Sequence, residues 1–332
     1  MKPRAITLRK HSMNLLRTVL HAAVLVAAAL LSLAGPARAQ HAGYRTLTIA
    51  GDAPATVALF YPTAVPDRAV PMGPWRPHVA PGAPASDAPL KGLILISHGT
   101  GGTELNHHDL ATSLARDGYL VAAVRHAGDN WQDRSLIASG RYLSERPQQL
   151  SRVLDALLAS PEWGARIPTE HIGAVGHSAG GYSVLALVGA QADPERSAQH
   201  CRTVQDDPGY CSLAKGPDGA GASTMPPPPA TSAVAPGART VSVPDRRIRA
   251  VVALAPMAVV FTPESLAAIT LPTLVIMAEH DAVLNGKYHG GYVVASRPNT
   301  QAGTVAGAGH FAFMAQPTFP LPSAAGDAAA NP

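Results

Sequence analysis

The sequence predicts an α/β fold with a mostly parallel central sheet and helices on both faces. Three observations indicate it: short apolar runs recur along the chain, helix patterns lie between them, and one run enters a glycine-rich turn followed by a small, apolar helix. Strands that alternate with helices in this way form parallel sheets. The chain has 332 residues, 46% of them hydrophobic, which suits one large domain of this class.

The expected strands are short runs rich in apolar and β-branched residues. They are Arg45–Ile49, Val57–Tyr61, Leu93–Ile96, Tyr119–Val124, Ile172–Val175, Ala250–Leu254 and Thr273–Met277. Because only a short turn at Gly51-Asp52 separates the first two, they predict an N-terminal hairpin. A proline-rich loop is expected to follow at residues 62–89.

The expected helices are Asp109–Arg116, Pro147–Leu158 and Tyr182–Ala190. In the second of them, leucine and valine recur at the spacing of an amphipathic helix, and Pro147 suits a first helical turn because its missing N–H is not needed there. We expect this helix to cover one face of the sheet.

Residues 1–39 predict a secretory signal peptide. They combine a basic start, an apolar run at 19–33 and the small-residue pattern at 37–39, with cleavage expected before Gln40. A membrane anchor and a buried helix are the alternatives. Cleavage would leave residues 40–332 as a periplasmic or secreted domain with no stable membrane span.

The net positive charge of the chain comes from these first 39 residues. The whole sequence has a formal net charge of +4, with 26 Lys and Arg against 22 Asp and Glu. Without the six basic residues of the leader, 20 basic residues remain against 22 acidic ones, a net charge of −2. No excess of positive charge remains for binding nucleic acid, so none is expected as a partner.

Residues 191–247 interrupt the alternation of strands and helices, and we expect them to form a surface insertion that is partly disordered. They contain both cysteines of the chain, Cys201 and Cys211. In an exported chain an even cysteine count predicts a disulfide, and two free buried thiols are the alternative. Residues 317–332, rich in proline and alanine, are expected to be a disordered tail.

The strongest chemical signal is the G-x-S-x-G pattern at residues 176–180, which lies between an expected strand and an expected helix. In this context the pattern is typical of the nucleophile turn of α/β-hydrolases, and it predicts Ser178 as the nucleophile. A glycine-rich turn without catalysis is the alternative. The turn is so tight that residues two before and two after the serine must be small, as Gly176 and Gly180 are.

A serine needs a base to take its proton and a third group to orient that base. In this fold the chain order is serine, acid, histidine. His310 follows in that order, flanked by small residues, and is the expected base. Asp281, just past an expected strand, is the expected acid, with Glu279 as the alternative.

Two backbone amides are expected to stabilise the negative charge that develops on the substrate oxygen. One belongs to Ala179, directly after the nucleophile, and the other to Thr100, in the Gly-rich stretch after the strand that ends at Ile96. His107 and His108 do not have a metal-ligand spacing, and a solvated helix start is expected there. No metal or other cofactor is required by this chemistry.

The chain resembles the predicted dienelactone hydrolase group of the α/β-hydrolases, which is related to platelet-activating-factor acetylhydrolases. The resemblance lies in RTLTI at 45–49, LFYPTA at 59–64, ISHGTGGTELNHHDLATSLARDGYLVAAVRHAGD at 96–129, VGHSAGGYS at 175–183, RIRAVVALAP at 247–256 and AGHFAFM at 308–314. Dienelactone hydrolases proper use a cysteine nucleophile, whereas position 178 is serine. In the acetylhydrolases, the acid of the triad follows the strand that comes after the nucleophile helix. This chain has no carboxylate at that place, which favours Asp281, after the next strand.

Together these features predict an exported serine hydrolase that cleaves carboxylic esters through an acyl-enzyme, with a small-molecule or lipid ester as substrate. A lipase-like or acetylhydrolase-like enzyme acting on lipid esters is one alternative, and a hydrophobic rim around the pocket would favour it. An inactive hydrolase-fold binding protein is the other. The acyl and alcohol specificity, the role of the insertion and the oligomeric state do not follow from the sequence.

Overall fold

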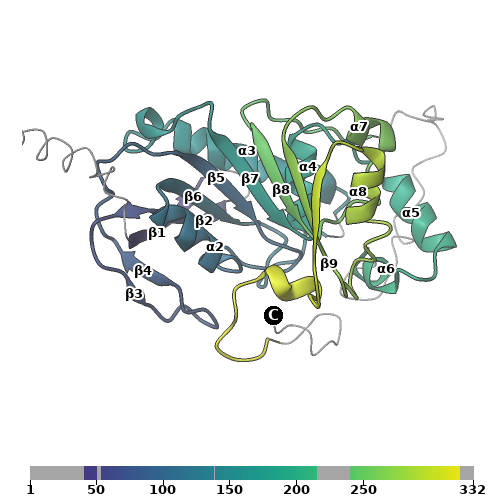
Figure 1. The fold of residues 1–332 in the computed structure, drawn as a ribbon, viewed down its shortest axis with the longest axis horizontal. Coiled ribbons are helices and arrows are strands. Elements are labelled where there is room, and N and C mark those ends of the chain that lie inside the picture. The colour runs from purple at the N-terminus through teal and green to yellow at the C-terminus, as the bar shows by residue number, and fades with distance from the viewer. Residues whose placement is uncertain (1–40, 51–53, 138, 215–239, 322–332) are drawn as a thin grey trace, which may run out of the picture. The chain divides into compact units, whose positions relative to one another are not determined.

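The central sheet has the strand order β10-β9-β8-β7-β5-β6-β2-β1-β4-β3 (Figure 1). The computed structural model describes residues 41–50, 54–137, 139–214 and 240–321. The strands are β1 (His41–Ile49), β2 (Ala55–Thr63), β3 (Arg68–Ala69), β4 (His78–Pro81), β5 (Gly92–Ser97), β6 (Tyr119–Arg125), β7 (Ile172–His177), β8 (Ala250–Leu254), β9 (Thr273–Ala278) and β10 (Gln301–Val305). The predicted signal peptide at 1–39 lies outside the described residues.

The sheet is parallel from β6 to β10 and mixed at its N-terminal side, where β1 also pairs in parallel with β4. β1 pairs antiparallel with β2, and β2 pairs antiparallel with β6, whereas β6, β5, β7, β8, β9 and β10 run in one direction. The predicted α/β class, the mostly parallel sheet and the N-terminal hairpin are therefore confirmed. β3 and β4 lie inside the proline-rich segment 62–89, which the sequence predicted as loop alone.

The helices are α2 (His108–Arg116), α3 (Tyr142–Leu158), α4 (Ala179–Leu187), α5 (Pro194–Thr203), α6 (Pro208–Ala214), α7 (Pro263–Ala267) and α8 (Gly290–Ser296), with 3-10 turns η1 (Gly164–Arg166) and η3 (His310–Phe313). α3 begins at Tyr142, so Pro147 lies inside the helix and not in its first turn. A proline at this position leaves the carbonyl of Leu143 without its usual helical donor. The buried Tyr182 hydroxyl donates to that carbonyl at 2.7 Å, which compensates for the loss.

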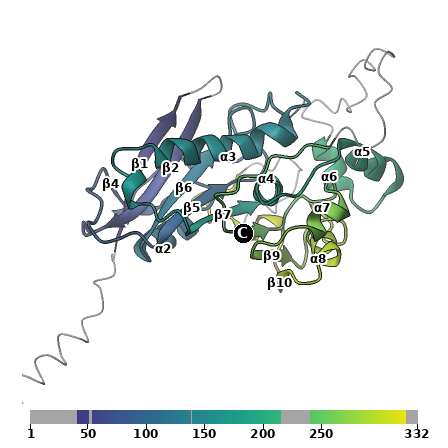
Figure 2. The same cartoon turned by 90° about the horizontal axis from the view of Figure 1, so that it is seen from above.

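Hydrophobic cores lie on both faces of the sheet because side chains alternate along each strand. In β2, Val57, Leu59 and Tyr61 face the core that includes α3 and α4, whereas Ala58 and Phe60 face the core that includes α2. Figure 2 shows α2 and α3 on opposite sides of the sheet. Because both faces of β2 are buried, a shift of one residue would turn each side chain to the opposite core. Packing on both faces therefore fixes the strand register.

The first part of the insertion is helical. α5 and α6 are joined by a Cys201–Cys211 disulfide, as predicted. Ala192, just before α5, forms isolated bridges with Val241 and Phe261, which attaches this segment to the domain. Residues 215–239, in the remainder of the insertion, lie outside the described residues.

The start of the predicted tail contacts the domain. Thr318 donates to the carbonyl of Pro74 through its backbone N–H, at 2.7 Å. Leu321 packs against the α2-side core. Residues 322–332 lie outside the described residues, so disorder there stays a prediction. Among the described helices, none is long and apolar enough to cross a membrane.

Candidate active site

Ser178 lies at the turn between β7 and α4 and has a strained backbone. Its φ of 56° and ψ of −118° fall in a region that residues with a side chain rarely adopt. Its N–H donates to the carbonyl of Leu254 and its carbonyl accepts from the N–H of Met257, so the residues after β8 support the turn on both sides. This geometry lifts the serine out of the regular strand and helix, as a nucleophile turn requires.

The neighbouring glycines are required by close backbone contacts. A Cβ on Gly176 would lie 2.0 Å from the carbonyl oxygen of Gly180. A Cβ on Gly180 would lie 1.9 Å from the carbonyl oxygen of Ser97, at the end of β5. Any larger residue at either position would displace the backbone that holds Ser178.

His310 and Asp281 are in direct contact. His310 Nδ1 donates to Asp281 Oδ2 at 2.7 Å, and both side chains are buried, with 3% and 4% exposed. Asp281 Oδ1 accepts from the N–H groups of Val283 and Leu284, which fixes the carboxylate. Because Nδ1 is engaged, Nε2 is the ring atom of His310 left to act on a substrate or a nucleophile.

Glu279, the alternative acid, lies elsewhere. Its side chain is 49% exposed and accepts from the N–H of Gly307. Of the two carboxylates that the sequence left open, Asp281 is therefore the one that contacts His310.

His177, directly before Ser178, connects the Ser178 turn to His310. It is buried, and its Nε2 donates to the backbone carbonyl of His310 at 2.9 Å. Burial holds the pKa of His177 well below its usual range, so the ring is neutral and keeps a single N–H for this bond. Among the described residues no hydrogen bond joins Ser178 Oγ to His310, as is common before a substrate tightens the site.

His107 holds the segment that carries His310, and the predicted solvated helix start is wrong. His107 and His108 are 4% and 9% exposed, because α2 packs its first turn against the C-terminal segment. His107 Nδ1 donates to the carbonyl of Phe313, and the N–H of Ala315 donates to the carbonyl of Asn106. Within the described part of the chain, no group of histidines, cysteines and carboxylates could hold a metal ion.

The Gly-rich loop after β5 passes directly beside Ser178. A Cβ on Gly99 would lie 3.1 Å from the Cβ of Ser178, a tight contact, so the close approach of this loop favours glycine at residue 99. Among the described residues, neither the N–H of Thr100 nor that of Ala179 donates to another group. Neither amide is therefore committed to a partner among the described residues.

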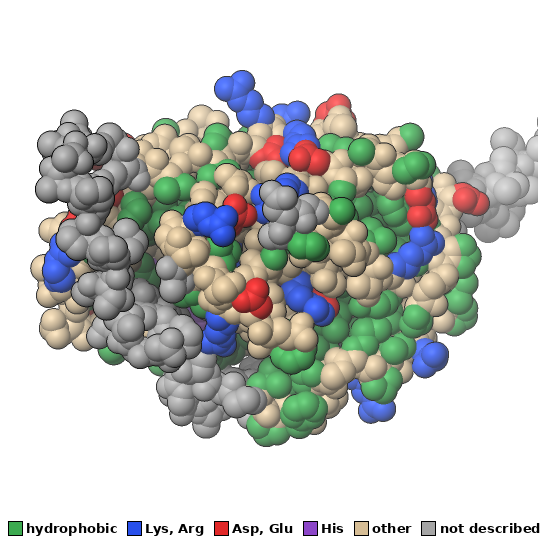
Figure 3. Space-filling model, turned by 180° about the vertical axis from the view of Figure 1, so that it is seen from behind, with side chains coloured by type: hydrophobic (Ala, Val, Ile, Leu, Met, Phe, Trp, Pro, Cys, Tyr) green, Lys and Arg blue, Asp and Glu red, His purple; other side chains and the backbone are tan. Residues whose placement is uncertain are grey.

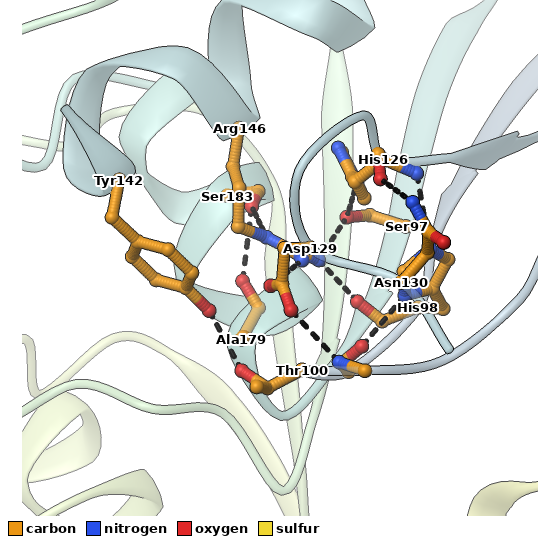
Figure 4. A network of polar contacts seen from close by, with 12 residues as sticks. Ser97, His98, Thr100, His126, Asp129, Asn130, Tyr142, Arg146, Ala179 and Ser183 are labelled. Atoms are coloured by element: carbon orange, nitrogen blue, oxygen red, sulfur yellow. Dashed lines mark hydrogen bonds and ion pairs between the residues drawn. The ribbon is translucent and has the colours of Figure 1, made fainter. Parts of the chain in front are cut away.

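A buried ion pair between Arg146 and Asp129 holds this loop (Figure 4). Both side chains are 0% exposed. Arg146, on α3, also donates to the carbonyl of His98, and Asp129 accepts from the N–H of Gly101 at 2.8 Å. The Thr100 hydroxyl is in turn hydrogen-bonded to the Tyr142 hydroxyl at 2.7 Å. Helix α3 thus holds the loop directly at His98 and Thr100, and through Asp129 at Gly101.

Two neutral histidines complete the network. His98 accepts from the N–H of His126 at its Nε2 and donates from Nδ1 to the carbonyl of Gly99. Burial and the nearby Arg146 lower the pKa of His98 to about 3. Burial likewise holds the pKa of His126 well below its usual range. His98 and His126 therefore serve as uncharged donors and acceptors beside the Arg146–Asp129 pair.

One cavity beside the segment after β6 does not include the candidate triad. It has a volume of about 720 Å³ and lies against residues 127–136 and the first half of α3, with Arg125, Arg141 and Arg152 among its lining. Ser178, Asp281 and His310 do not line it. The site is therefore defined by its hydrogen bonds and its turn, not by this cavity.

The chain matches many chains of known structure. A ferulic acid esterase from Streptomyces cinnamoneus superposes with a TM-score of 0.54 at 21% sequence identity, covering 85% of this chain and 78% of the esterase. The chain has the α/β-hydrolase fold. At this identity the likeness shows the fold alone. No protein-family profile and no curated protein matches the chain.

The α/β-hydrolase fold brings together residues that the sequence analysis did not single out. Arg146, Asp129 and His177 act on the backbone of the loops around Ser178, and they come from three different elements. The available signal was position: Arg146 lies four residues before Leu150, on the side of α3 that is buried, and His177 lies at the end of the buried strand β7. Polar residues at such buried positions mostly have their hydrogen bonds satisfied.

Proposed function

We propose that this protein is an exported serine hydrolase that cleaves carboxylic esters through an acyl-enzyme. The observation that carries the proposal is the strained Ser178 turn, which lies beside a loop with a free amide and is linked through His177 to the hydrogen-bonded His310–Asp281 pair. An esterase as structural neighbour is consistent with it.

In this mechanism, Ser178 Oγ attacks the carbonyl carbon of the ester while His310 Nε2 takes its proton. Asp281 holds the imidazole and stabilises its charged form. The N–H groups of Thr100 and Ala179 receive the developing oxyanion. His310 then returns the proton to the leaving alcohol, and a water molecule, activated by the same histidine, hydrolyses the acyl-enzyme.

Export is part of the proposal and has two supports. The sequence of residues 1–39 has the pattern of a secretory signal, and the Cys201–Cys211 disulfide suits an oxidising compartment. Mass spectrometry of exported, non-reduced protein should give a chain that begins at Gln40 and has no alkylatable thiol. An intact leader or two reactive thiols would contradict this part.

A small-molecule ester fits the surface better than a membrane lipid does. The large hydrophobic side chains that are exposed among the described residues are Val65, Trp131, Val305 and Phe319. Of these, only Trp131 is hydrogen-bonded to the Gly-rich loop, through its N–H to the carbonyl of Gly102. One exposed aromatic residue does not form the hydrophobic rim expected of a lipase. On the face shown in Figure 3, basic and acidic side chains are interspersed, with no patch of one sign.

The substitution Ser178→Ala tests the proposal. Removing the nucleophile should lower the hydrolysis of p-nitrophenyl esters by several powers of ten. Ser113→Ala, which removes an exposed hydroxyl on α2, is the matched control and should keep wild-type activity. Residual activity of Ser178→Ala above about a hundredth of wild type would overturn the assignment, since the nucleophile of a triad contributes far more than that.

A further inference from the structure

The insertion contains a buried carboxylate that the proposed mechanism does not use. Asp207 lies between α5 and α6 and is 2% exposed. Its Oδ2 accepts from His200 Nε2 at 2.8 Å and from His289 Nε2 at 2.9 Å. Its Oδ1 accepts from the N–H of Asn285 at 2.9 Å. A carboxylate that is buried with three donors is a built structural feature and not a chance surface contact.

A fourth hydrogen bond fixes the tautomer of His289. The N–H of Ala258 donates to His289 Nδ1 at 3.1 Å, so Nδ1 is unprotonated and Nε2 carries the hydrogen that Asp207 accepts. Burial lowers the pKa of His289 and favours its neutral form. Burial alone would raise the pKa of Asp207, but the hydrogen bonds from His289 and the Asn285 N–H lower it. His289 is therefore a neutral donor to a charged carboxylate.

Asn285 and His289 belong to the loop at residues 281–289, which we call the acid loop because it begins with Asp281. Asp281 binds the N–H groups of the next residues, Val283 and Leu284, at its own end of the loop. Asp207 binds the other end, at Asn285 and His289. The carboxylate from the insertion thus completes the support of a loop whose first residue contacts His310.

Helix α6 packs directly on the acid loop. Tyr210 is in the same buried cluster as Val283 and Leu284, with Cys201 and Cys211 packed against it. A Cβ on Gly209 would lie 2.5 Å from the carbonyl oxygen of Val283, so only glycine allows this contact. The disulfide closes a ring of residues 201–211 that includes Asp207, Gly209 and Tyr210.

We propose that the disulfide-closed segment 201–211 positions the acid of the triad, with Asp207 as the positioning residue. This inference rests on the proposed function, because it assigns Asp281 a catalytic task. It gives the insertion a role in the reaction: the segment holds the acid loop so that Asp281 meets His310 in one geometry. His289 extends the same support to the nucleophile, since its partner Ala258 follows Met257, whose N–H binds the carbonyl of Ser178.

Asp207→Asn is the direct test. The amide keeps the volume but cannot accept from both histidines and from Asn285 at once. We expect kcat for a p-nitrophenyl ester to fall at least tenfold while KM stays within about twofold, because the substrate-binding surface is untouched. A general loss of folded protein would instead lower the active fraction, which titration with a fluorophosphonate measures directly.

Gly209→Ala and Gly303→Ala form a matched pair that does not remove any polar group. Gly209→Ala forces α6 away from Val283, and we expect the same fall in kcat at unchanged KM. Gly303 lies on β10, outside the acid loop, and an added Cβ would meet only Ile276 at an ordinary 3.4 Å, so Gly303→Ala should retain wild-type kcat. If Asp207→Asn does not fold, this pair still decides the question.

Reduction tests the contribution of the disulfide. Dithiothreitol should lower kcat of the wild type at unchanged KM and reversibly, and the double variant Cys201→Ser/Cys211→Ser should have the lower kcat and no response to the reagent. Wild-type kcat in Asp207→Asn, Gly209→Ala and the reduced protein would overturn the inference while the proposed function stands. An inactive wild type with no labelled serine would overturn the proposed function and the inference together.

Discussion

At the residue scale, the hydrogen bond between His310 and Asp281 has the clearest consequence. Asp281 Oδ2 accepts the Nδ1 hydrogen and is itself held by two backbone N–H groups, so the imidazole has one orientation and one tautomer. Asp281→Asn should keep the fold but favour the wrong tautomer, because the amide can donate to Nδ1. We expect kcat to fall by roughly 10³–10⁴-fold.

Glu279→Gln is the matched control for this prediction. Glu279 lies two residues before Asp281 in the chain, and its carboxylate is half exposed. It accepts from the N–H of Gly307 and does not contact His310. We expect a change in kcat of less than about tenfold, since a carboxylate outside the triad has no imidazole to orient. A larger loss in Glu279→Gln than in Asp281→Asn would move the acid to Glu279, and small effects in both would mean that another carboxylate completes the triad.

At the scale of elements, α3 and the Gly-rich loop are coupled through Arg146 and Asp129. Because both charges are fully buried, removing one leaves the other without a partner. Arg146→Met and Asp129→Leu should each lower the free energy of unfolding by about 3–5 kcal/mol. The double variant should lose much less than the sum of the two, because no unpaired charge remains. Urea unfolding of all four proteins measures this coupling, and additive losses would contradict it.

Some of these structural elements could be predicted from the sequence and others could not. Three features could be predicted from the sequence. The G-x-S-x-G turn and the hairpin of β1 and β2 depend on residues that are close in the chain. The acid and the histidine follow from the chain order serine, acid, histidine of this fold. The start of α3 does not: Pro147 suggests a first turn, and only the donor Tyr182 on α4 allows the helix to begin at Tyr142. The contacts of Asp207 with Asn285 and His289 span 78 and 82 residues, a separation at which local pattern carries no information.

At the scale of the whole molecule, buried neutral histidines make the fold sensitive to acid. Burial lowers the pKa of His98 to about 3, and it holds the pKa values of His126 and His177 well below their usual range. Each would bind a proton near pH 6.5 in the unfolded chain. Between the pKa in the folded protein and the pKa in the unfolded chain, the unfolded state binds more protons than the folded state. The free energy of unfolding therefore falls as the pH is lowered below about 6.5.

Each of these histidines contributes a slope of up to about 1.4 kcal/mol per pH unit in that range. We expect the free energy of unfolding, measured with urea, to fall steeply between pH 7.5 and pH 5.5. The loss should continue toward the pKa of His98 in the folded protein, where it ends for that residue. An unfolding free energy that stays constant over this range would mean that these histidines are protonated to the same extent in both states.

The central claim is that Ser178 forms the covalent intermediate, and labelling tests it most directly. The mature protein is treated with a fluorophosphonate, digested and mapped by mass spectrometry. We predict one adduct, on Ser178, that is absent in Ser178→Ala, forms much more slowly in Asp281→Asn and forms at the wild-type rate in Glu279→Gln. An unlabelled Ser178 in folded protein, or an adduct on a different serine, would contradict the account.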